Sequence, residues 1–224
     1  MKQICAKYAS KFIKDGMIVG LGGGSTIQYV VDLVKDKKIQ VVTPSMNTAL
    51  CCQKAGLPVL NTKFVNHIDI AFDGCDEVDS NFYALKSGGG IHTQEKIIAS
   101  MADEYIVLID ESKYFKTLPF EHPIVVEVLC NAYQIVLKKL EQMNAKVVAR
   151  KADNKDGFLL SDEGNYLLDV YFEKVQDIET LNQKLLMMPG IVDTSLFVDR
   201  VTGIIMVNEK GVFKKDKGGE FYAL

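Results

Sequence analysis

The sequence predicts an α/β fold with a doubly wound, mostly parallel sheet. Short apolar segments of strand-like composition alternate with segments whose apolar residues recur at helical spacing. This alternation is typical of parallel strands joined by crossover helices. In addition, polar or glycine-rich loops follow several of the apolar segments directly. Such loops are expected at the carboxyl ends of the strands of an open sheet, where ligands bind.

The first part of the chain contains the elements of this sheet in order. A helix up to about residue 14 opens the chain, because its apolar residues lie near helical spacing and Asp15-Gly16 ends it. The next strand leads into a glycine loop, after which Ser25 and Thr26 can cap a helix. We expect strands over residues 17–19, 41–43, 68–72 and 105–109, and helices over residues 25–34, 47–55 and 93–101.

The pattern changes after residue 118. Tight turns, such as the one at residues 162–165, separate short strands, and two helices lie among them. This predicts a smaller α+β domain with an antiparallel sheet. The last apolar strand, residues 203–208, could return to the first sheet, so we expect one domain from residues 1–120 plus 202–224 and a second from residues 121–201. The second is predicted to hold strands over residues 124–128, 146–150, 158–160, 166–172 and 194–198, and helices over residues 132–143 and 179–187.

Composition limits the possible functions. The 224 residues carry a formal net charge of −3 and are 48% hydrophobic, which argues against a general nucleic-acid or membrane-surface binder. No apolar run approaches the ~18 residues needed to span a membrane, and the N-terminus lacks the apolar core of a signal peptide. The five cysteines form no Cys-x-x-Cys pair and the three histidines are isolated. We therefore expect a cytoplasmic protein with reduced thiols and no zinc site.

Four polar loops are the best candidates for a ligand site. They cover residues 20–26, 73–79, 86–95 and 110–113. Three of them follow predicted strands directly and the other lies between two of these. Since ligands of open α/β sheets bind outside the carboxyl ends of the strands, we expect these loops to meet at one pocket.

The first loop has the composition of an anion site. Glycines such as Gly23 and Gly24 let backbone N–H groups approach a ligand, and the N-terminus of the following helix favours phosphate. Ser25 and Thr26 add hydroxyl donors. An ordinary strand-to-helix turn with a hydroxyl cap explains this loop equally well, and no lysine completes a P-loop motif.

The second loop is acidic. Asp73 and Asp76 lie three residues apart, with Glu77 and Asp79 close behind. Crowded carboxylates repel one another, so we expect some to have raised pKa values suited to proton transfer. A Mg²⁺ site and a solvated acidic turn are the alternatives. Cys75, among these carboxylates, is interpreted as a packing residue rather than a nucleophile.

The third and fourth loops supply cations and a further carboxylate. Lys86 precedes three consecutive glycines, and Glu95 follows on the next helix. Such a pair suits proton abstraction next to a carbonyl group, with Glu95 as the base and Lys86 stabilising the oxygen that gains negative charge. A plain helix start is the alternative. Lys113 can bind phosphate as a point charge, although a lysine there can also be merely solvated. His92 is interpreted as a bystander, and Lys2 could reach the pocket from the first helix.

Together these motifs resemble those of the type A ribose-5-phosphate isomerases, over essentially the whole chain. The residues that carry the resemblance are Gly22-Gly23-Gly24-Ser25-Thr26, Asp73-Gly74-Cys75-Asp76-Glu77, Lys86 through Glu95-Lys96-Ile97-Ile98-Ala99, Asp110-Glu111-Ser112-Lys113, Val125-Val126-Glu127-Val128, Gly164-Asn165-Tyr166-Leu167-Leu168-Asp169 and Pro189-Gly190-Ile191-Val192.

The resemblance implies an activity, an assembly and a set of site residues. It implies a Rossmann-like domain with a smaller α+β domain, a homodimer or homotetramer, and a cofactor-independent interconversion of ribose 5-phosphate and ribulose 5-phosphate in the pentose phosphate pathway. Glu95 would be the general base of an enediolate mechanism, with Asp73, Asp76 and Lys86 as further catalytic residues and no metal. The substrate site would comprise Gly23, Gly24, Ser25, Thr26, Asp73, Gly74, Cys75, Asp76, Lys86, Ser87, Gly88, Gly89 and Lys113.

The sequence departs from the pattern of that family at four positions. Gly23 stands where threonine is common, Ser87 replaces the first glycine of a four-glycine run, and His92 and Gln94 stand where leucine and arginine are frequent. A sugar-phosphate-sensing protein without turnover is an alternative, and so is a metal-dependent phosphosugar enzyme that uses the residue 73–79 carboxylates. The retained Glu95, and an N-terminal helix too short for a helix-turn-helix module, favour the isomerase.

Overall fold

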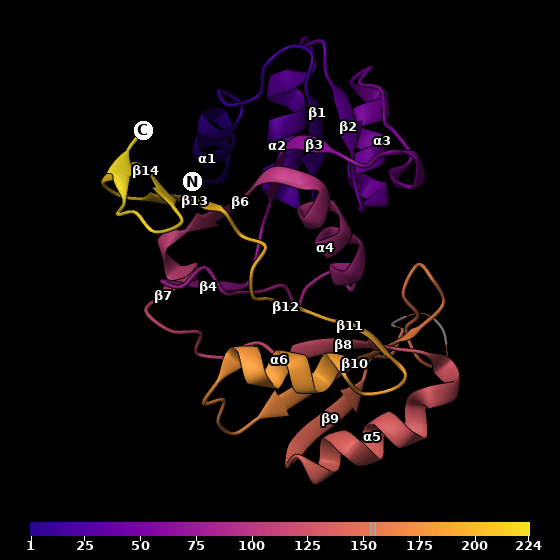
Figure 1. Ribbon diagram of the computed structural model, residues 1–224. Coiled ribbons are helices and arrows are strands. Elements are labelled where there is room, and N and C mark those ends of the chain that lie inside the picture. Colours follow the sequence, from indigo (N-terminus) through magenta and orange to yellow (C-terminus); the bar gives the residue numbers. More distant parts are fainter. Residues whose placement is uncertain (153, 155) are drawn as a thin grey trace.

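The computed structural model describes residues 1–152, 154 and 156–224, and its largest sheet has seven strands (Figure 1). The strand order is β15-β14-β13-β6-β3-β1-β2. The strands from β13 to β2 pair in parallel, and β14 and β15 add an antiparallel edge. Their bounds are β1 (Ile18–Leu21), β2 (Gln40–Val42), β3 (Ile68–Asp73), β6 (Ala102–Asp110), β13 (Gly203–Asn208), β14 (Gly211–Asp216) and β15 (Tyr222–Ala223).

Helices cover both faces of this sheet, which confirms the predicted doubly wound α/β fold. The helices are α1 (Lys2–Ala9), α2 (Ser25–Val34), α3 (Met46–Lys54) and α4 (His92–Met101). Because successive strand residues point to opposite faces, Phe72 of β3 packs in the core beneath α1 and α2, while the adjacent Ala71 packs in the core that includes Ile98 of α4.

A second sheet is antiparallel and carries its own core. Its order is β11-β8-β10-β9, and α5 and α6 pack against it. The bounds are β8 (Ile124–Val128), β9 (Ala145–Ala149), β10 (Tyr166–Phe172), β11 (Ile191–Thr194), α5 (Tyr133–Gln142) and α6 (Ile178–Leu186). All of these elements fall within residues 121–201, although the division of the chain into two independent domains stays a prediction.

A small third sheet lies between the other two (Figure 1). Its order is β12-β5-β4-β7, and short 3₁₀ turns complete the secondary structure. The bounds are β4 (Glu77–Asp79), β5 (Ala84–Leu85), β7 (Tyr114–Phe115), β12 (Leu196–Phe197), η1 (Thr62–Phe64), η2 (Glu111–Lys113) and η3 (Cys130–Ala132). Within the described residues, no helix has the length and apolarity that a membrane crossing requires.

Two predictions about the N-terminal helices are wrong. The first helix ends at Ala9 rather than near residue 14. The chain beyond it forms turns instead, and the Lys37 ammonium bonds the backbone carbonyls of Ser10 and Ile13. At α2, Gly24 rather than Ser25 or Thr26 is the N-cap residue, and no side chain caps this helix. Gly24 has φ +90°, a conformation that glycine adopts without strain.

Two predicted strands differ from the observed ones. The predicted strand over residues 194–198 is divided at Ser195, because this residue passes from one sheet to the other. Its hydroxyl and N–H bond the backbone of Val125 in β8, while its carbonyl accepts from the Lys86 N–H. The predicted strand over residues 158–160 is reduced to isolated bridges at Phe158 and Leu160.

Candidate active site

A cavity of about 280 Å³ lies where the predicted polar loops meet, at the carboxyl ends of β1 and β3. Its lining comes from the loops after these strands, from the segment between β5 and α4, and from the 3₁₀ turn after β6. The lining residues are Gly23, Gly24, Asp73, Gly74, Cys75, Asp76, Lys86, Gly88, Gly89, Ile91, Glu95 and Lys113. The fold therefore brings together most of the residues that the sequence analysis singled out.

Lys86 lies in this cavity between two carboxylates. Its ammonium is 3.1 Å from Asp73 Oδ2 and 3.3 Å from Glu95 Oε1, and it also donates to the Gly74 carbonyl. The exposed fractions of the three side chains are only 5%, 4% and 7% for Lys86, Asp73 and Glu95. The three N–H donors of the ammonium thus have three protein acceptors.

Burial changes the acid strength of Glu95. Burial and the negative charge of Asp73 raise the pKa of the Glu95 carboxyl from 4.5 to about 8, although Lys86 acts in the opposite direction. Burial alone would lower the pKa of the Lys86 ammonium, but the charges of Asp73 and Glu95 raise it above its usual value. The site thus combines a persistent cation with a carboxyl that titrates near neutral pH, which is the property of a general base.

The Asp73 carboxylate is held rigidly from several sides. The Tyr105 hydroxyl donates to Oδ2 at 2.9 Å and the Gly74 N–H donates to Oδ1 at 2.7 Å. On another side the backbone of Gly22 is so close that a Cβ at this position would lie 2.0 Å from the Asp73 carboxyl carbon. Glycine at position 22 therefore permits the position of Asp73.

The loop after β1 and two lysines form a cationic region beside this cluster. The N-terminus of α2 begins at Gly24, and the Lys2 ammonium donates to Ser25 Oγ at 2.9 Å. Lys113 donates to a backbone carbonyl of the loop after β3 at 2.8 Å. Lys2, Thr26 and Lys113 also line a small cavity next to the first. A helix N-terminus with two nearby ammonium groups favours a phosphate.

Comparison with known families gives this geometry a context. Residues 40–211 match the family model described as ribose 5-phosphate isomerase A (phosphoriboisomerase A). The chain belongs to this family. A ribose-5-phosphate isomerase A from Pyrococcus abyssi is 38% identical over 219 residues, covering 95% of this chain and 96% of the relative.

Solved structures agree with this assignment to the ribose 5-phosphate isomerase A family. The ribose 5-phosphate isomerase A of Methanocaldococcus jannaschii superposes with a TM-score of 0.90 at 34% identity, covering 96% of this chain and 98% of that one. A D-ribose-5-phosphate isomerase in complex with phospho-erythronic acid gives the same TM-score and identity over 96% of this chain and 97% of the other.

In this member of the ribose 5-phosphate isomerase A family, the acidic loop does not form one cluster. Asp73 faces the cavity, and Asp76 Oδ2 accepts from the N–H groups of Ser87 and Gly88 at 2.7 and 2.9 Å. Glu77 and Asp79 are buried in β4 and accept from backbone N–H groups of the loops around residues 81–83 and 118–122. Two of the four carboxylates, those of Glu77 and Asp79, therefore stabilise the small third sheet and do not face the cavity.

Three further residues contribute no free polar side-chain group to the cavity. The Ser87 hydroxyl donates to the Pro123 carbonyl, and the Cys75 side chain is buried, which raises the pKa of its thiol to about 12. His92 is fully buried, and this burial lowers the pKa of its imidazole to about 3. These surroundings support the interpretations of Cys75 as a packing residue and of His92 as a bystander.

The sequence analysis missed the residues through which the second sheet supports the site. Arg150 links Asp169 of β10, at 2.8 Å, to the Ser87 carbonyl in the glycine loop. Glu127 of β8 accepts from Thr93 at the start of α4 and is itself held by hydroxyl and amide donors of residues 161 and 165. Glu127 and Asp169 stand in the sequence analysis only among the residues that carry the family resemblance, and no local signal marks Arg150, because all three act across the fold.

Proposed function

We propose that this protein interconverts D-ribose 5-phosphate and D-ribulose 5-phosphate, moving a proton between C1 and C2 through an enediolate. The buried Lys86 ammonium between Asp73 and Glu95, in a cavity that also contains Gly24 and Lys113, carries this proposal. Relatives of this chain are named ribose-5-phosphate isomerase A, and that reaction belongs to the non-oxidative branch of the pentose phosphate pathway. One similar structure is described with phospho-erythronic acid, a phosphorylated sugar acid.

Glu95 is the base in this proposal. A carboxyl whose pKa is raised to about 8 holds an abstracted proton far better than an ordinary glutamate, and it can still ionise near neutral pH. Its Oε2 atom is buried and has no hydrogen-bond partner among the residues that the structure describes. That oxygen is free to take the proton from C2 and to return it at C1.

Lys86 and Asp73 stabilise the enediolate in this proposal. The Lys86 ammonium already has three acceptors, of which Glu95 at 3.3 Å is more distant than Asp73. A substrate oxygen that replaces Glu95 at the ammonium would both stabilise the developing negative charge and release the base. Asp73 would keep the ammonium in place during this exchange and, with Asp76, contact substrate hydroxyl groups and assist ring opening.

The phosphate end of the substrate would lie against the loop after β1. The helix N-terminus at Gly24, the hydroxyl groups of Ser25 and Thr26, and Lys113 provide donors of the required kind. Lys2 joins this set through its bond to Ser25. The remaining backbone contacts would come from Ser87 and from five residues that line the active-site cavity: Gly23, Gly74, Cys75, Gly88 and Gly89.

The pH dependence should reveal the raised pKa of Glu95. The base acts only when it is deprotonated, so kcat/KM should rise with pH through about 8 and fall as pH decreases below that value. Since the pKa of Lys86 is raised as well, loss of its proton should not limit activity below pH 9. Initial rates across pH 5–9 test this. A kcat/KM that is already constant from pH 6 to pH 9, as an ordinary glutamate with a pKa of 4.5 would give, would contradict the proposed environment of the base.

Replacing Lys113 with alanine should mainly weaken substrate binding. Its ammonium donates to the Cys75 carbonyl, lines the same cavity as the proton-transfer cluster, and has the charge to hold phosphate. Loss of one charge-assisted contact, about 1.5–3 kcal/mol, corresponds to a KM higher by roughly 10–100-fold with a smaller change in kcat. Steady-state kinetics separate the two constants, and an unchanged KM would exclude Lys113 from the phosphate site.

Two adjacent glycines provide a matched test of the Asp73 position. A methyl group at Gly22 would lie 2.0 Å from the Asp73 carboxyl carbon, whereas one at Gly23 would have no neighbour closer than 3.7 Å. Gly22→Ala should displace Asp73 and reduce kcat by up to about 10²-fold, the cost of misplacing a reacting group by about 1 Å. Gly23→Ala leaves the Asp73 carboxyl in place, so kcat should stay near that of the unmodified protein, and any effect on the proposed phosphate contacts should appear in KM. Equal effects of the two substitutions would show that Asp73 needs no such exact placement.

The experiment that tests the function is conversion of ribose 5-phosphate by the purified protein with excess chelator. Formation of ribulose 5-phosphate supports a metal-independent isomerase. Binding of ribose 5-phosphate without conversion would instead indicate a sugar-phosphate sensor. Activity that returns only with added Mg²⁺ would show that the carboxylates of residues 73–79 hold a metal.

The same proposal includes the assembly, the domains and the cellular location. We infer a cytoplasmic homodimer or homotetramer, with residues 1–120 plus 202–224 as the catalytic domain and residues 121–201 as a smaller one. The separate core beneath α5 and α6 supports this division. Light scattering of the purified protein tests the assembly, because a monomer at all concentrations would contradict it.

A further inference from the structure

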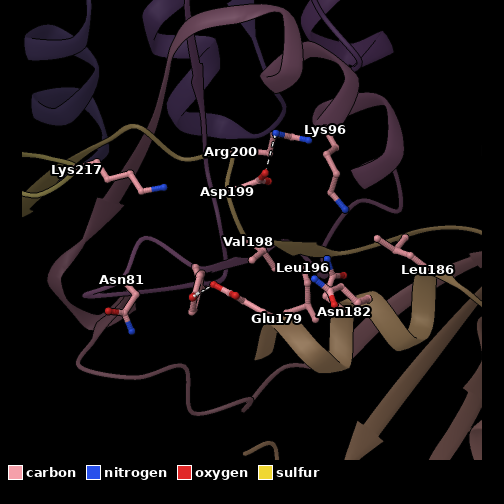
Figure 2. A pocket seen from close by; sticks show the side chains of 12 residues that line it. Asn81, Lys96, Glu179, Asn182, Leu186, Leu196, Val198, Asp199, Arg200 and Lys217 are labelled. Atoms are coloured by element: carbon pink, nitrogen blue, oxygen red, sulfur yellow. Dashed lines mark hydrogen bonds and ion pairs between the residues drawn. The ribbon is translucent and has the colours of Figure 1, made fainter. Parts of the chain in front are cut away.

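A second cavity, of about 640 Å³, lies between α6 and the segments that connect the sheets (Figure 2). It shares no lining residue with the candidate active site. In Figure 2, Lys217 extends into it from one side and Lys96 from α4 on the other, and Asn182 of α6 closes it below. Its volume falls in the range of about 300–1,000 Å³ that is typical of small-molecule sites.

Among the described residues, Lys217 is the cation lining this cavity that has no ion-pair partner, since Lys96 pairs with Asp193 and Arg200 pairs with Asp199. Three cations line the cavity, Lys96, Arg200 and Lys217, against the two carboxylates of Glu179 and Asp199. Both carboxylates already have partners. Glu179 accepts from the Tyr83 hydroxyl, and Asp199 pairs with one terminal nitrogen of Arg200 at 3.2 Å.

Arg200 retains a donor without an acceptor. Its Nε is buried and has no hydrogen-bond partner within the described part of the chain. The guanidinium is a planar fork that matches the oxygens of a carboxylate or phosphate, and buried donors of this kind are normally satisfied. Nε itself has no accessible surface, whereas the Arg200 side chain as a whole is 38% exposed, so an oxyanion in the cavity would contact the exposed terminal nitrogens and would accept from Nε only after the side chain rotates.

The neighbouring cation supports the same conclusion. Lys96 is only 15% exposed and bonds Asp193 at 2.7 Å and the Thr194 carbonyl at 2.6 Å. Burial lowers the pKa of its ammonium despite Asp193, and the charge of Arg200 adds to this effect. A bound anion would reduce the repulsion between Lys96 and Arg200.

We propose that this cavity is a second site, which binds a small organic anion through a phosphate or carboxylate group held by Arg200 and Lys217. The amides of Asn182 and Gln183 would contact polar groups on the body of the ligand, and Leu186 would contact its apolar part. The site does not depend on the proposed isomerase activity. It lies next to the proposed catalytic helix, because Lys96 follows Glu95 in α4.

Calorimetric titration with inorganic pyrophosphate and with citrate tests the site and distinguishes phosphate from carboxylate ligands. The titrations use the Lys113→Ala protein as well as the unmodified chain, because the active-site cavity can also take an anion. We expect saturable binding of at least one probe that persists in Lys113→Ala and is weakened at least about tenfold in Arg200→Gln/Lys217→Gln, the effect of losing a charge-assisted contact.

A matched variant controls for overall charge. Lys35→Gln/Lys38→Gln removes two exposed positive charges from the far end of α2 and should leave binding unchanged. In the unmodified protein, the side-chain amide NMR signals of Asn182 and Gln183 should shift as the probe is added, a readout that needs no variant to fold. No saturable binding of either probe at millimolar concentration, or equal binding by both double variants, would overturn the proposal.

Discussion

Replacing Glu95 with glutamine is expected to lower turnover by about 10²–10⁴-fold, the usual contribution of a general acid–base group. The substitution keeps the size of the side chain but removes its ability to accept a proton. Lys86 would still be bound by Asp73 at 3.1 Å and by the Gly74 carbonyl, so the ammonium should keep its position. Measurement of kcat for conversion of ribose 5-phosphate gives the effect directly.

A matched substitution separates the proposed role of Glu95 from a general loss of charge. Glu104→Gln makes the same chemical change at an exposed position on β6 and should leave kcat unchanged. Binding of ribose 5-phosphate to Glu95→Gln should persist, because the phosphate contacts remain. A Glu95→Gln protein with near-normal turnover would remove Glu95 from the role of base, while one that no longer binds the substrate would indicate a structural role instead.

Elements with continuous apolar character were predictable from sequence. Residues 124–128 and 203–208 were predicted with the bounds that β8 and β13 have in the structure. β-Branched residues occupy four of five positions in the first and three of six in the second, and both strands are buried along almost their entire length. Local composition is sufficient to predict such strands, because a short, bounded run of apolar, β-branched residues is typical of a strand that is buried on both faces.

Elements that depend on distant partners were not predictable in this way. Residues 77–79 contain two acidic side chains, yet they form β4 and are fully buried, since backbone donors from the segments around residues 81–83 and 118–122 satisfy both carboxylates. Lys214 of β14 is also buried, next to Asp216 and over the Phe12 ring. Charged residues are usually exposed, so the sequence pattern does not predict buried strands at β4 and β14.

The candidate site likewise has some features that local sequence predicts and others that depend on distant partners. The positions of the strand ends can be predicted from local sequence, and ligands of open sheets bind at the carboxyl ends of the strands. These two facts together predict that the loops of Asp73, Lys86 and Glu95 meet. The contacts that fix these groups could not be derived in the same way. Tyr105 reaches Asp73 only because β3 and β6 pair in the observed register, and the raised pKa of Glu95 requires burial that no local pattern reveals.

Replacing Lys86 with methionine is expected to reduce both activity and stability. The variant loses the cation proposed to stabilise the enediolate, and removal of such a group costs about 10²–10³-fold in kcat. It also leaves the carboxylates of Asp73 and Glu95 buried without their cation. Breaking a buried ion pair in this way costs about 3–5 kcal/mol, which for a chain of this size corresponds to a Tm lower by roughly 6–20 °C. Lys63→Met, at an exposed position, is the control.

The pH dependence of the Tm of Lys86→Met shows whether the lost stability comes from the missing charge or from the changed packing. The Lys86 ammonium lowers the pKa of Glu95 in the unmodified protein, so without it the folded-state pKa of Glu95 should lie further above the unfolded value, and the folded variant is favoured when Glu95 is protonated and disfavoured as pH rises through this raised pKa. The Tm difference from the unmodified protein should therefore be larger at pH 8 than at pH 5. Adding Glu95→Gln to Lys86→Met should restore part of the lost stability at pH 8, because the Glu95 carboxyl must take up a proton to be buried without the cation, whereas glutamine needs none. A Tm difference that is equal at both pH values and unaffected by Glu95→Gln would mean that Lys86 stabilises the fold through its packing, and the charge balance proposed for this site would then be wrong.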